Sequence, residues 1–151
     1  MKGQRTSMMG NACAVARALD AIGDWWSMLI VREAFYGRRR FGEFQKSLGL
    51  AKNILAVRLR KLVDCGVLAA VPSAERKNLK EYVLTPKGES LHVVMVALYQ
   101  WGAAHCFKPG ERPITLVDSA LGAPLQAIEL KAQDGRAVGL HDLRFVMEAE
   151  Q

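Results

Sequence analysis

LAKNILAVRLRKLVDCG, residues 50–66, carries the strongest structural signal in the chain. At about 100° per residue, Leu55, Leu59 and Leu62 fall in one narrow arc, which predicts a helix over residues 51–65 with an apolar face. Gly66 followed by Val67 is typical of the left-handed cap that ends such a helix. One side of this helix is therefore available for a core and the other for a ligand. The side opposite the leucines carries Asn53, Ala56, Val57 and Arg60, with Lys61 beside them.

Three helices are predicted upstream of this segment. The first covers residues 12–22 and ends at Gly23. Asp24 can cap the second, which runs to residue 35, because its carboxylate can accept hydrogen bonds from the free N–H groups of the first turn. The third covers residues 41–48 and ends at Gly49. Together with residues 51–65, it forms a pair of helices joined by a glycine turn.

Downstream, the spacing of the apolar residues changes from helical to strand-like. Residues 67–71 and 81–84 are β-prone runs, and the polar connector 72–78 suits a hairpin with a basic tip. Thr85 and Pro86 are typical of a helix start, so a helix is predicted from there to His105. Its apolar stripe is wider than one small core requires. Two helices around a turn, followed by a hairpin, are the outline of a winged helix-turn-helix.

Length and composition restrict the class of protein. With 151 residues, half of them apolar and 24% charged, the chain suits one globular domain with a small appendage. No apolar stretch reaches the roughly 18 to 20 residues of a membrane span and no secretory signal is recognisable, so we expect a cytoplasmic protein without membrane contact. The cysteines and histidines follow no zinc, redox or catalytic spacing, and no nucleotide-binding or hydrolase motif is present. The sequence thus predicts no enzyme, no metal and no cofactor.

The positive charge is concentrated in one band. The formal net charge is +6, but residues 38–80 hold 11 basic and 3 acidic side chains, whereas residues 109–151 hold 4 basic and 7 acidic ones. Such a density favours a polyanion, and double-stranded DNA suits a helix whose outer face offers hydrogen-bonding groups. On charge alone, a merely solvated surface is the alternative.

A set of motifs then follows in order along residues 12–105: CAVARALDAIGDWW at 13–26, RFGEFQ at 40–45, LAVRLRKL at 55–62, Gly66, EYVLTPKG at 81–88, and Trp101-Gly102. These motifs resemble those of the HxlR family of bacterial and archaeal transcription regulators. The resemblance implies a dimeric winged-helix DNA-binding protein, with the first and last helices at the dimer interface and residues 50–65 as the recognition region. Ala14 and Ala51 depart from the family pattern, which usually has Pro after the N-terminal cysteine and often Ser or Thr at the start of the recognition helix.

The side chains of the helix and hairpin are assigned to DNA by their chemistry. Asn pairs bidentately with adenine, Arg pairs with guanine, and Val can contact a thymine methyl group. On this basis, base-edge contacts are predicted for Lys52, Asn53, Val57 and Arg60. Phosphates require charge more than geometry. Phosphate contacts are predicted for Arg38, Arg39, Arg40, Arg58, Lys61, Arg76, Lys77 and Lys80, and for any one of them a solvated side chain is the alternative.

Two features indicate ligands other than DNA. Cys13 stands at a predicted helix N-terminus, where the dipole favours a thiolate, and it matches the cysteine of thiol-sensing family members. The alternative is that Cys13 packs as a small apolar group at the dimer contact. Trp25 and Trp26 are candidates for lining an aromatic effector pocket, although large aromatic residues at helical positions are more often part of the core.

The composition changes again beyond residue 108. Apolar residues alternate with polar ones around an Asp134-Gly135 turn, which predicts three or four short strands. This part is similar to the C-terminal extension of longer HxlR proteins but lacks cysteine. The predicted fold is α+β and mainly helical: a winged helix-turn-helix with a dimerising terminal helix over residues 1–108, and a small β-rich C-terminal extension over residues 109–151.

The predicted function is sequence-specific DNA binding by a homodimer on a near-palindromic operator, with repression by promoter occlusion. A thiol-reactive or small aromatic effector would modulate this binding. The alternatives are a winged-helix protein-interaction module without specific DNA binding and a small thiol-dependent enzyme. The basic band argues against both.

Overall fold

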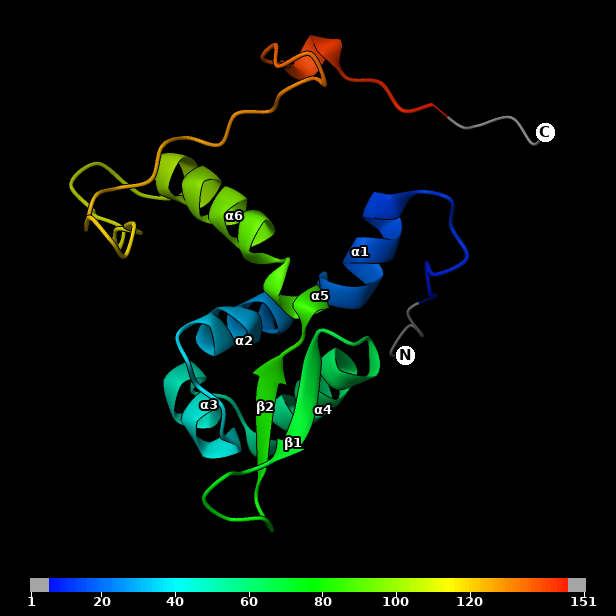
Figure 1. Cartoon of the computed structure of the whole chain (residues 1–151), viewed down its shortest axis with the longest axis vertical. Coiled ribbons are helices and arrows are strands. Elements are labelled where there is room, and N and C mark those ends of the chain that lie inside the picture. The colour runs from blue at the N-terminus through cyan, green and yellow to red at the C-terminus, as the bar shows by residue number, and fades with distance from the viewer. Residues whose placement is uncertain (1–5, 147–151) are drawn as a thin grey trace. The chain divides into compact units, whose positions relative to one another are not determined.

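The computed structural model describes residues 6–146. The chain divides into two compact units between Met95 and Val96. The first unit contains α1 (Ala14–Ile22), α2 (Trp25–Phe35), α3 (Phe41–Leu48), α4 (Lys52–Asp64), β1 (Leu68–Pro72), β2 (Lys80–Leu84) and α5 (Pro86–Glu89). Helix α6 (His92–His105) crosses the division, and the short 3-10 helix η1 (Leu140–Asp142) lies in the second unit. Figure 1 shows α3, α4 and the β1–β2 hairpin gathered below α2.

The core of the first unit is built on the leucine face of α4. Leu55, Leu59 and Leu62 are all fully buried, which confirms the predicted orientation of this helix. Each such side chain contributes roughly 1.5 to 3 kcal/mol by leaving water. The leucine face is therefore held strongly in place, and the remaining buried apolar residues around it are Ile30, Val31, Phe44, Leu50, Val67 and Leu68.

The predicted hairpin is present, and a short segment before α3 pairs with its second strand. β1 and β2 pair antiparallel, with Leu68 opposite Leu84 and Pro72 opposite Lys80. The Tyr82 N–H donates to the Arg39 carbonyl at 2.7 Å, and an isolated bridge joins Arg40 to Glu81. The loop between α2 and α3 is thereby hydrogen-bonded to the wing.

The ends of the helices follow the predictions in part. Asp24 caps α2 by accepting from the Ser27 N–H at 2.9 Å, and Gly66 ends α4 at the predicted positive φ of 76°. Thr85 likewise caps α5, accepting from the Gly88 N–H at 3.1 Å. Ala51 provides no side-chain cap for α4.

The single helix predicted from Pro86 to His105 is wrong, because α5 and α6 are separate elements. Two carbonyls at the break are engaged by side chains. The Ser90 hydroxyl donates to the Lys87 carbonyl at 2.7 Å, and His92 Nδ1 lies 2.9 Å from the Glu89 carbonyl. Such side-chain contacts compete with a continuous backbone ladder.

The prediction of a β-rich C-terminal extension is also wrong. Between residues 106 and 146, the described chain has two isolated bridges, Val117 with Pro124 and Lys131 with Ala137, and no strand. The Asp134-Gly135 turn forms, with Gly135 at a φ of 84°, but the ladder beside it does not continue. The alternating apolar residues remain mostly exposed, so no buried face stabilises a sheet in a single chain.

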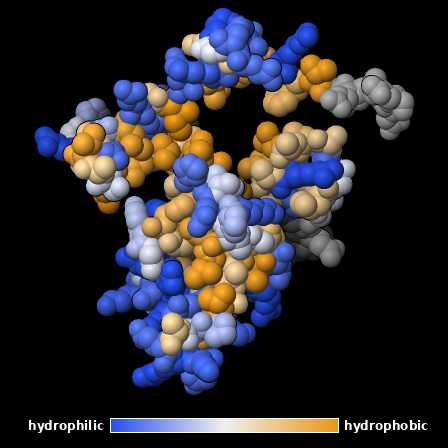
Figure 2. Space-filling view, in the orientation of Figure 1, coloured by the Kyte–Doolittle hydropathy of each residue, from blue (hydrophilic) through white to orange (hydrophobic). Residues whose placement is uncertain are grey.

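The surface of each unit has its own character. Figure 2 shows hydrophilic side chains over the hairpin end of the first unit and apolar side chains gathered over α6. Helices α1 and α6 each bury none of their residues. Within residues 6–146, none of the helices combines the length and apolar character needed to cross a membrane.

Candidate nucleic-acid interface

Of the four residues predicted to contact base edges, Asn53, Val57 and Arg60 share the solvent side of α4, and Lys52 lies at the exposed first turn beside them. Lys52, Asn53 and Arg60 are exposed, and Val57 is 57% exposed. Because Leu55, Leu59 and Leu62 hold the other side in the core, α4 presents this face without any rearrangement of the unit. The face combines two cations, an amide and a branched apolar group.

Arg58 and Lys61 lie on a different side of α4, where they pair with the cap of α2. Their side-chain nitrogens are 3.5 and 3.2 Å from Asp24 Oδ2. Burial raises the pKa of Asp24, but hydrogen bonds from Ser27 and Lys61 and the charge of Arg58 hold that pKa below its ordinary value. Asp24 is therefore an ionised carboxylate that joins the start of α2 to α4.

The arginine triplet predicted for phosphates is also ion-paired. Arg38 lies 3.0 Å from the Glu33 carboxylate, and Arg39 lies 3.9 Å from that of Glu81. Arg40 pairs with Glu75 and lies 3.7 Å from Glu81. These arginines fasten the loop between α2 and α3 to the body and to the wing.

Glu33 is the acidic centre of this arrangement, with a side chain only 3% exposed. Arg32 binds one of its oxygens at 2.7 Å, while Arg38 and the Ser47 hydroxyl bind the other at 3.0 and 2.5 Å. Burial raises the pKa of Glu33, but Ser47, Arg32 and Arg38 together lower it below its ordinary value. Glu33 thus connects α2 and α3 as a buried, charged anchor.

Sequence reasoning identified Asp24 only as the cap of α2, and it did not identify Asp24, Glu33 or Glu81 as ion-pair partners of the basic residues. A signal exists for Glu33, which interrupts the apolar run of α2 five positions before Arg38. Glu81 begins the second predicted strand. It lies beside Arg39 and Arg40 in the structure, but nothing in the sequence indicates that this loop and this strand are neighbours. Several basic residues that the sequence analysis assigned to phosphates are therefore partly neutralised by these three carboxylates.

The wing tip differs from the triplet. Arg76, Lys77 and Lys80 are exposed, and their side chains enter none of the ion pairs formed among residues 6–146. They follow Glu75, which is itself paired with Arg40. The wing tip therefore carries three charges that are available for a polyanion.

A profile of the HxlR-like helix-turn-helix family matches residues 21–109. The chain belongs to this family. Its members are transcription regulators rather than enzymes. The matched region contains α2 to α6, and with them the hairpin and the exposed face of α4.

Individual relatives extend this result. The uncharacterised HTH-type transcriptional regulator Rv3095 of Mycobacterium tuberculosis is 42% identical over 103 residues, which are 68% of this chain and 65% of that relative. The match thus spans slightly less than two thirds of the relative's own length. The crystal structure of PA1607, a proposed transcription factor, is 51% identical, covers 95% of this chain and 100% of its own, and has a TM-score of 0.90.

A second similar structure is that of the redox regulator HypR in its reduced form. It is 26% identical, with a TM-score of 0.57 over 62% of this chain and 94% of that protein. In the present chain, Cys13 is exposed and stands directly before α1. Its N–H donates to the Asn11 side chain at 2.8 Å, and Arg17 lies one turn further along the helix. Cys65 is partly buried and Cys106 is exposed.

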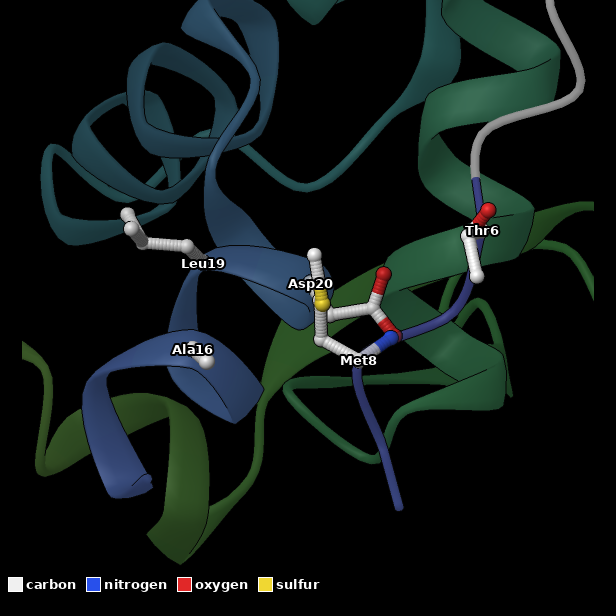
Figure 3. Close-up of a pocket in the computed structure, with 5 residues that line it drawn as sticks. All are labelled: Thr6, Met8, Ala16, Leu19 and Asp20. Carbon is white, nitrogen blue, oxygen red and sulfur yellow. The ribbon is translucent and has the colours of Figure 1, made fainter. Parts of the chain in front are cut away.

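The two tryptophans at the start of α2 do not share one environment. Trp25 is 85% exposed, whereas Trp26 packs against the core. A cavity of about 430 Å³ lies between the N-terminal segment and α1, where Met8 and Asp20 are close together (Figure 3). Neither tryptophan is among its lining residues, which are Thr6, Met8, Ala16, Leu19 and Asp20.

A second, more open groove of about 690 Å³ lies along α4. Val57 and Arg60 of the predicted recognition face contribute to its wall, together with Cys65. Lys87 of α5 also lines it and donates to the Cys65 carbonyl at 2.6 Å. The remaining lining residues are Met9, Asp20, Ala21, Lys61 and Asp64.

Proposed function

We propose that this HxlR-like protein is a homodimeric, sequence-specific DNA-binding regulator that represses transcription by occupying a near-palindromic operator. The observation that carries the proposal is the exposed face of α4, fixed in orientation by three buried leucines on its other side. A helix of this diameter fits the major groove of B-DNA, where each base pair presents a distinct set of donors and acceptors.

Each residue of this face has a role in the proposed complex. The Asn53 amide donates to and accepts from an adenine edge, and the Arg60 guanidinium donates to O6 and N7 of a guanine. Val57 contacts a thymine methyl group, and Lys52, at the first turn, reaches a second guanine. These contacts supply sequence preference, because phosphate contacts carry none directly.

The cations fall into two groups in this proposal. Arg76, Lys77 and Lys80 on the wing bind phosphates beside the groove, since no carboxylate competes for them among the described residues. The ion-paired group contributes less to phosphate binding, because its carboxylate partners already satisfy part of its charge. This second group comprises Arg38, Arg39, Arg40, Arg58 and Lys61.

Dimerisation is proposed through α1 and α6. Val15 and Leu19 on α1, and Leu98 and Trp101 on α6, are each more than half exposed. On each helix the two side chains lie three or four positions apart and so share one face, and exposed apolar side chains grouped in this way are typical of an interface. A two-fold dimer would place two copies of α4 about 34 Å apart, one helical turn of DNA, which matches a palindromic site.

Cys13 is proposed as a thiol that couples oxidants or electrophiles to DNA binding. It is accessible, precedes a helix, and lies in the part of the chain proposed to dimerise. Treatment with diamide should lower operator affinity in the wild type and leave Cys13→Ser unaffected. Unchanged affinity in both proteins would refute the sensor role and favour the alternative that Cys13 only packs at the dimer contact. Trp25, the more exposed tryptophan, is the better placed of the two for an aromatic effector.

Binding to a duplex of the protein's own upstream region, compared with a scrambled duplex, tests the proposal. Fluorescence anisotropy at several salt concentrations should give a steep negative salt slope and a preference for the upstream duplex. Asn53→Ala should reduce the preference, while the control Asn78→Ala, an exposed asparagine on the wing loop, should preserve it. A shallow slope with no preference would instead favour the protein-interaction module.

A further inference from the structure

Arg40 lies between two carboxylates whose surroundings differ. Its Nη2 pairs with Glu75 on the wing loop, and its Nε lies 3.7 Å from Glu81 Oε1. The Glu81 side chain is 12% exposed and also accepts from the Ser73 hydroxyl at 2.8 Å, whereas the Glu75 side chain is 74% exposed. One end of the guanidinium is therefore fixed against the hairpin, and the other end pairs with a carboxylate that is mostly in water.

Few contacts restrain the Glu75 carboxylate. Within residues 6–146, Arg40 is the one group that hydrogen-bonds to it, and the backbone N–H of Glu75 donates to the Ser73 hydroxyl at 3.3 Å. An ion pair between exposed side chains contributes little, typically a factor of about 1.4 to 5 in an equilibrium constant. A competing anion can therefore open the pair between Arg40 and Glu75 at small cost.

The carboxylate partners of the other ion-paired cations at the candidate interface are much less exposed. The exposed fraction of the side chain is 3% for Glu33 and 12% for both Asp24 and Glu81. Taking the cation away from such a carboxylate is strongly unfavourable, because the remaining negative charge is left unpaired and shielded from water. Among the ion-paired cations, Arg40 is therefore the one whose Glu75 partner is easily exchanged.

Arg40 also stands at the junction of two elements that face the DNA backbone in a winged helix-turn-helix. It directly precedes α3, the first helix of the pair, and this helix crosses the backbone when the second helix enters the major groove. An isolated bridge to Glu81 places Arg40 beside β2 of the wing. Its side chain is 43% exposed, so the guanidinium is accessible to a phosphate.

We propose that Glu75 is an internal competitor for DNA: it pairs with Arg40 in the free protein, and a backbone phosphate displaces it in the complex. The proposal rests on the DNA-binding function proposed above and adds a regulation of that site. Glu81 keeps the guanidinium in place, so binding exchanges one anion for another at a prepositioned donor. Phosphate contacts carry no sequence information directly, so Glu75 sets the strength of binding and leaves sequence preference to α4.

Glu75→Gln tests the competition, because it removes the charge and keeps the size of the side chain. In anisotropy titrations of the full-length protein at low salt, we expect this variant to bind the upstream and scrambled duplexes about two- to fivefold more tightly than the wild type. The matched control Glu89→Gln removes an exposed carboxylate on α5 that enters no ion pair among residues 6–146, and it should leave both affinities unchanged. An equal gain in the two variants would be an effect of net charge and would overturn the proposal.

Variants of Arg40 test whether Glu75 acts through this side chain. Arg40→Ala should reduce the magnitude of the salt slope by about 0.9, the value of one phosphate contact, whereas Arg38→Ala, whose partner Glu33 is buried, should keep the wild-type slope. In the double variant Arg40→Ala with Glu75→Gln, the gain in affinity from Glu75→Gln should disappear, because no guanidinium remains to be released. A wild-type slope in Arg40→Ala, or a gain that persists without Arg40, would contradict the exchange.

The wild-type titrations separate failure of this proposal from failure of the proposed function. A wild type that prefers the upstream duplex, together with no gain in Glu75→Gln, refutes the role of Glu75 alone. A wild type that binds neither duplex refutes both. Tighter binding by Glu75→Gln with an altered sequence preference would indicate a role for Glu75 in base recognition and would likewise refute the competition for phosphate.

Discussion

The division of the cations into free and ion-paired groups leads to a sharp prediction about DNA binding. A variant that replaces Arg76, Lys77 and Lys80 with alanine removes the charges of the wing tip. Arg38→Ala removes one arginine of the triplet, whose guanidinium is 3.0 Å from buried Glu33. We expect the wing variant to change affinity for DNA and the Arg38 variant to change stability.

The size of each effect follows from the contacts. Each phosphate contact adds about 0.9 to the magnitude of the salt slope, so the wing variant should have a slope shallower by roughly 2.7. Between 50 and 200 mM salt, that difference corresponds to about 40-fold less loss of affinity. Arg38→Ala leaves Glu33 with Arg32 and Ser47 as partners, so we expect a loss of about 1 to 2 kcal/mol of unfolding free energy rather than the full penalty of an isolated buried charge.

Two assays separate the variants. Anisotropy titrations at four salt concentrations give the slope, on operator and scrambled duplex alike, and urea denaturation gives the unfolding free energy. The wing variant should weaken both duplexes equally while remaining as stable as the wild type. A normal salt slope in the wing variant, or a reduced slope without destabilisation in Arg38→Ala, would show that the ion pairs do not determine which cations bind DNA.

Three further predictions concern stability. Gly88→Ala should destabilise the protein by about 1 to 3 kcal/mol, because the new Cβ would overlap the Val67 carbonyl oxygen. The control Gly42→Ala, with open space around it, should be neutral or slightly stabilising in thermal denaturation. Ala51→Ser should stabilise α4 by about 0.5 to 1 kcal/mol by capping its free N–H groups, and an unchanged urea midpoint would contradict this. The lowered pKa of Glu33 means that its contribution to stability is complete above the unfolded-state pKa near 4.5 and is lost as the pH falls toward the folded-state pKa. Glu33→Gln should therefore lower stability at pH 7 and flatten its dependence on acid below about pH 4.5, whereas Glu89→Gln at an exposed position should keep the wild-type profile.

Much of the fold could be predicted because its signals are local. The spacing of Leu55, Leu59 and Leu62 oriented α4, and Gly66 marked its end before the hairpin. The family resemblance extended this outline over the domain that the HxlR-like profile matches. Local periodicity is sufficient for α3 and α4 because each turns an apolar face toward a single core.

The parts that could not be predicted depend on contacts between distant residues. Arg39 and Glu81 are far apart in sequence, and their pairing appears only once the loop lies against the wing. In the C-terminal segment, a local pattern was present but did not determine the structure. Its apolar residues do alternate, but Gln100 and Tyr99 hold its backbone on α6, and no strand pairs with it among residues 6–146. Alternation indicates an apolar face, not what covers it.

Dimethyl sulfate footprinting on the operator tests the major-groove role of α4 most directly. The reagent methylates N7 of guanine in the major groove and N3 of adenine in the minor groove, so the two grooves are read in one experiment. We predict two clusters of protected guanines about 10 base pairs apart, and loss of protection at one guanine in each cluster in Arg60→Ala. Protection confined to adenine N3, or a guanine pattern that Arg60→Ala leaves intact, would contradict the insertion of this helix face into DNA.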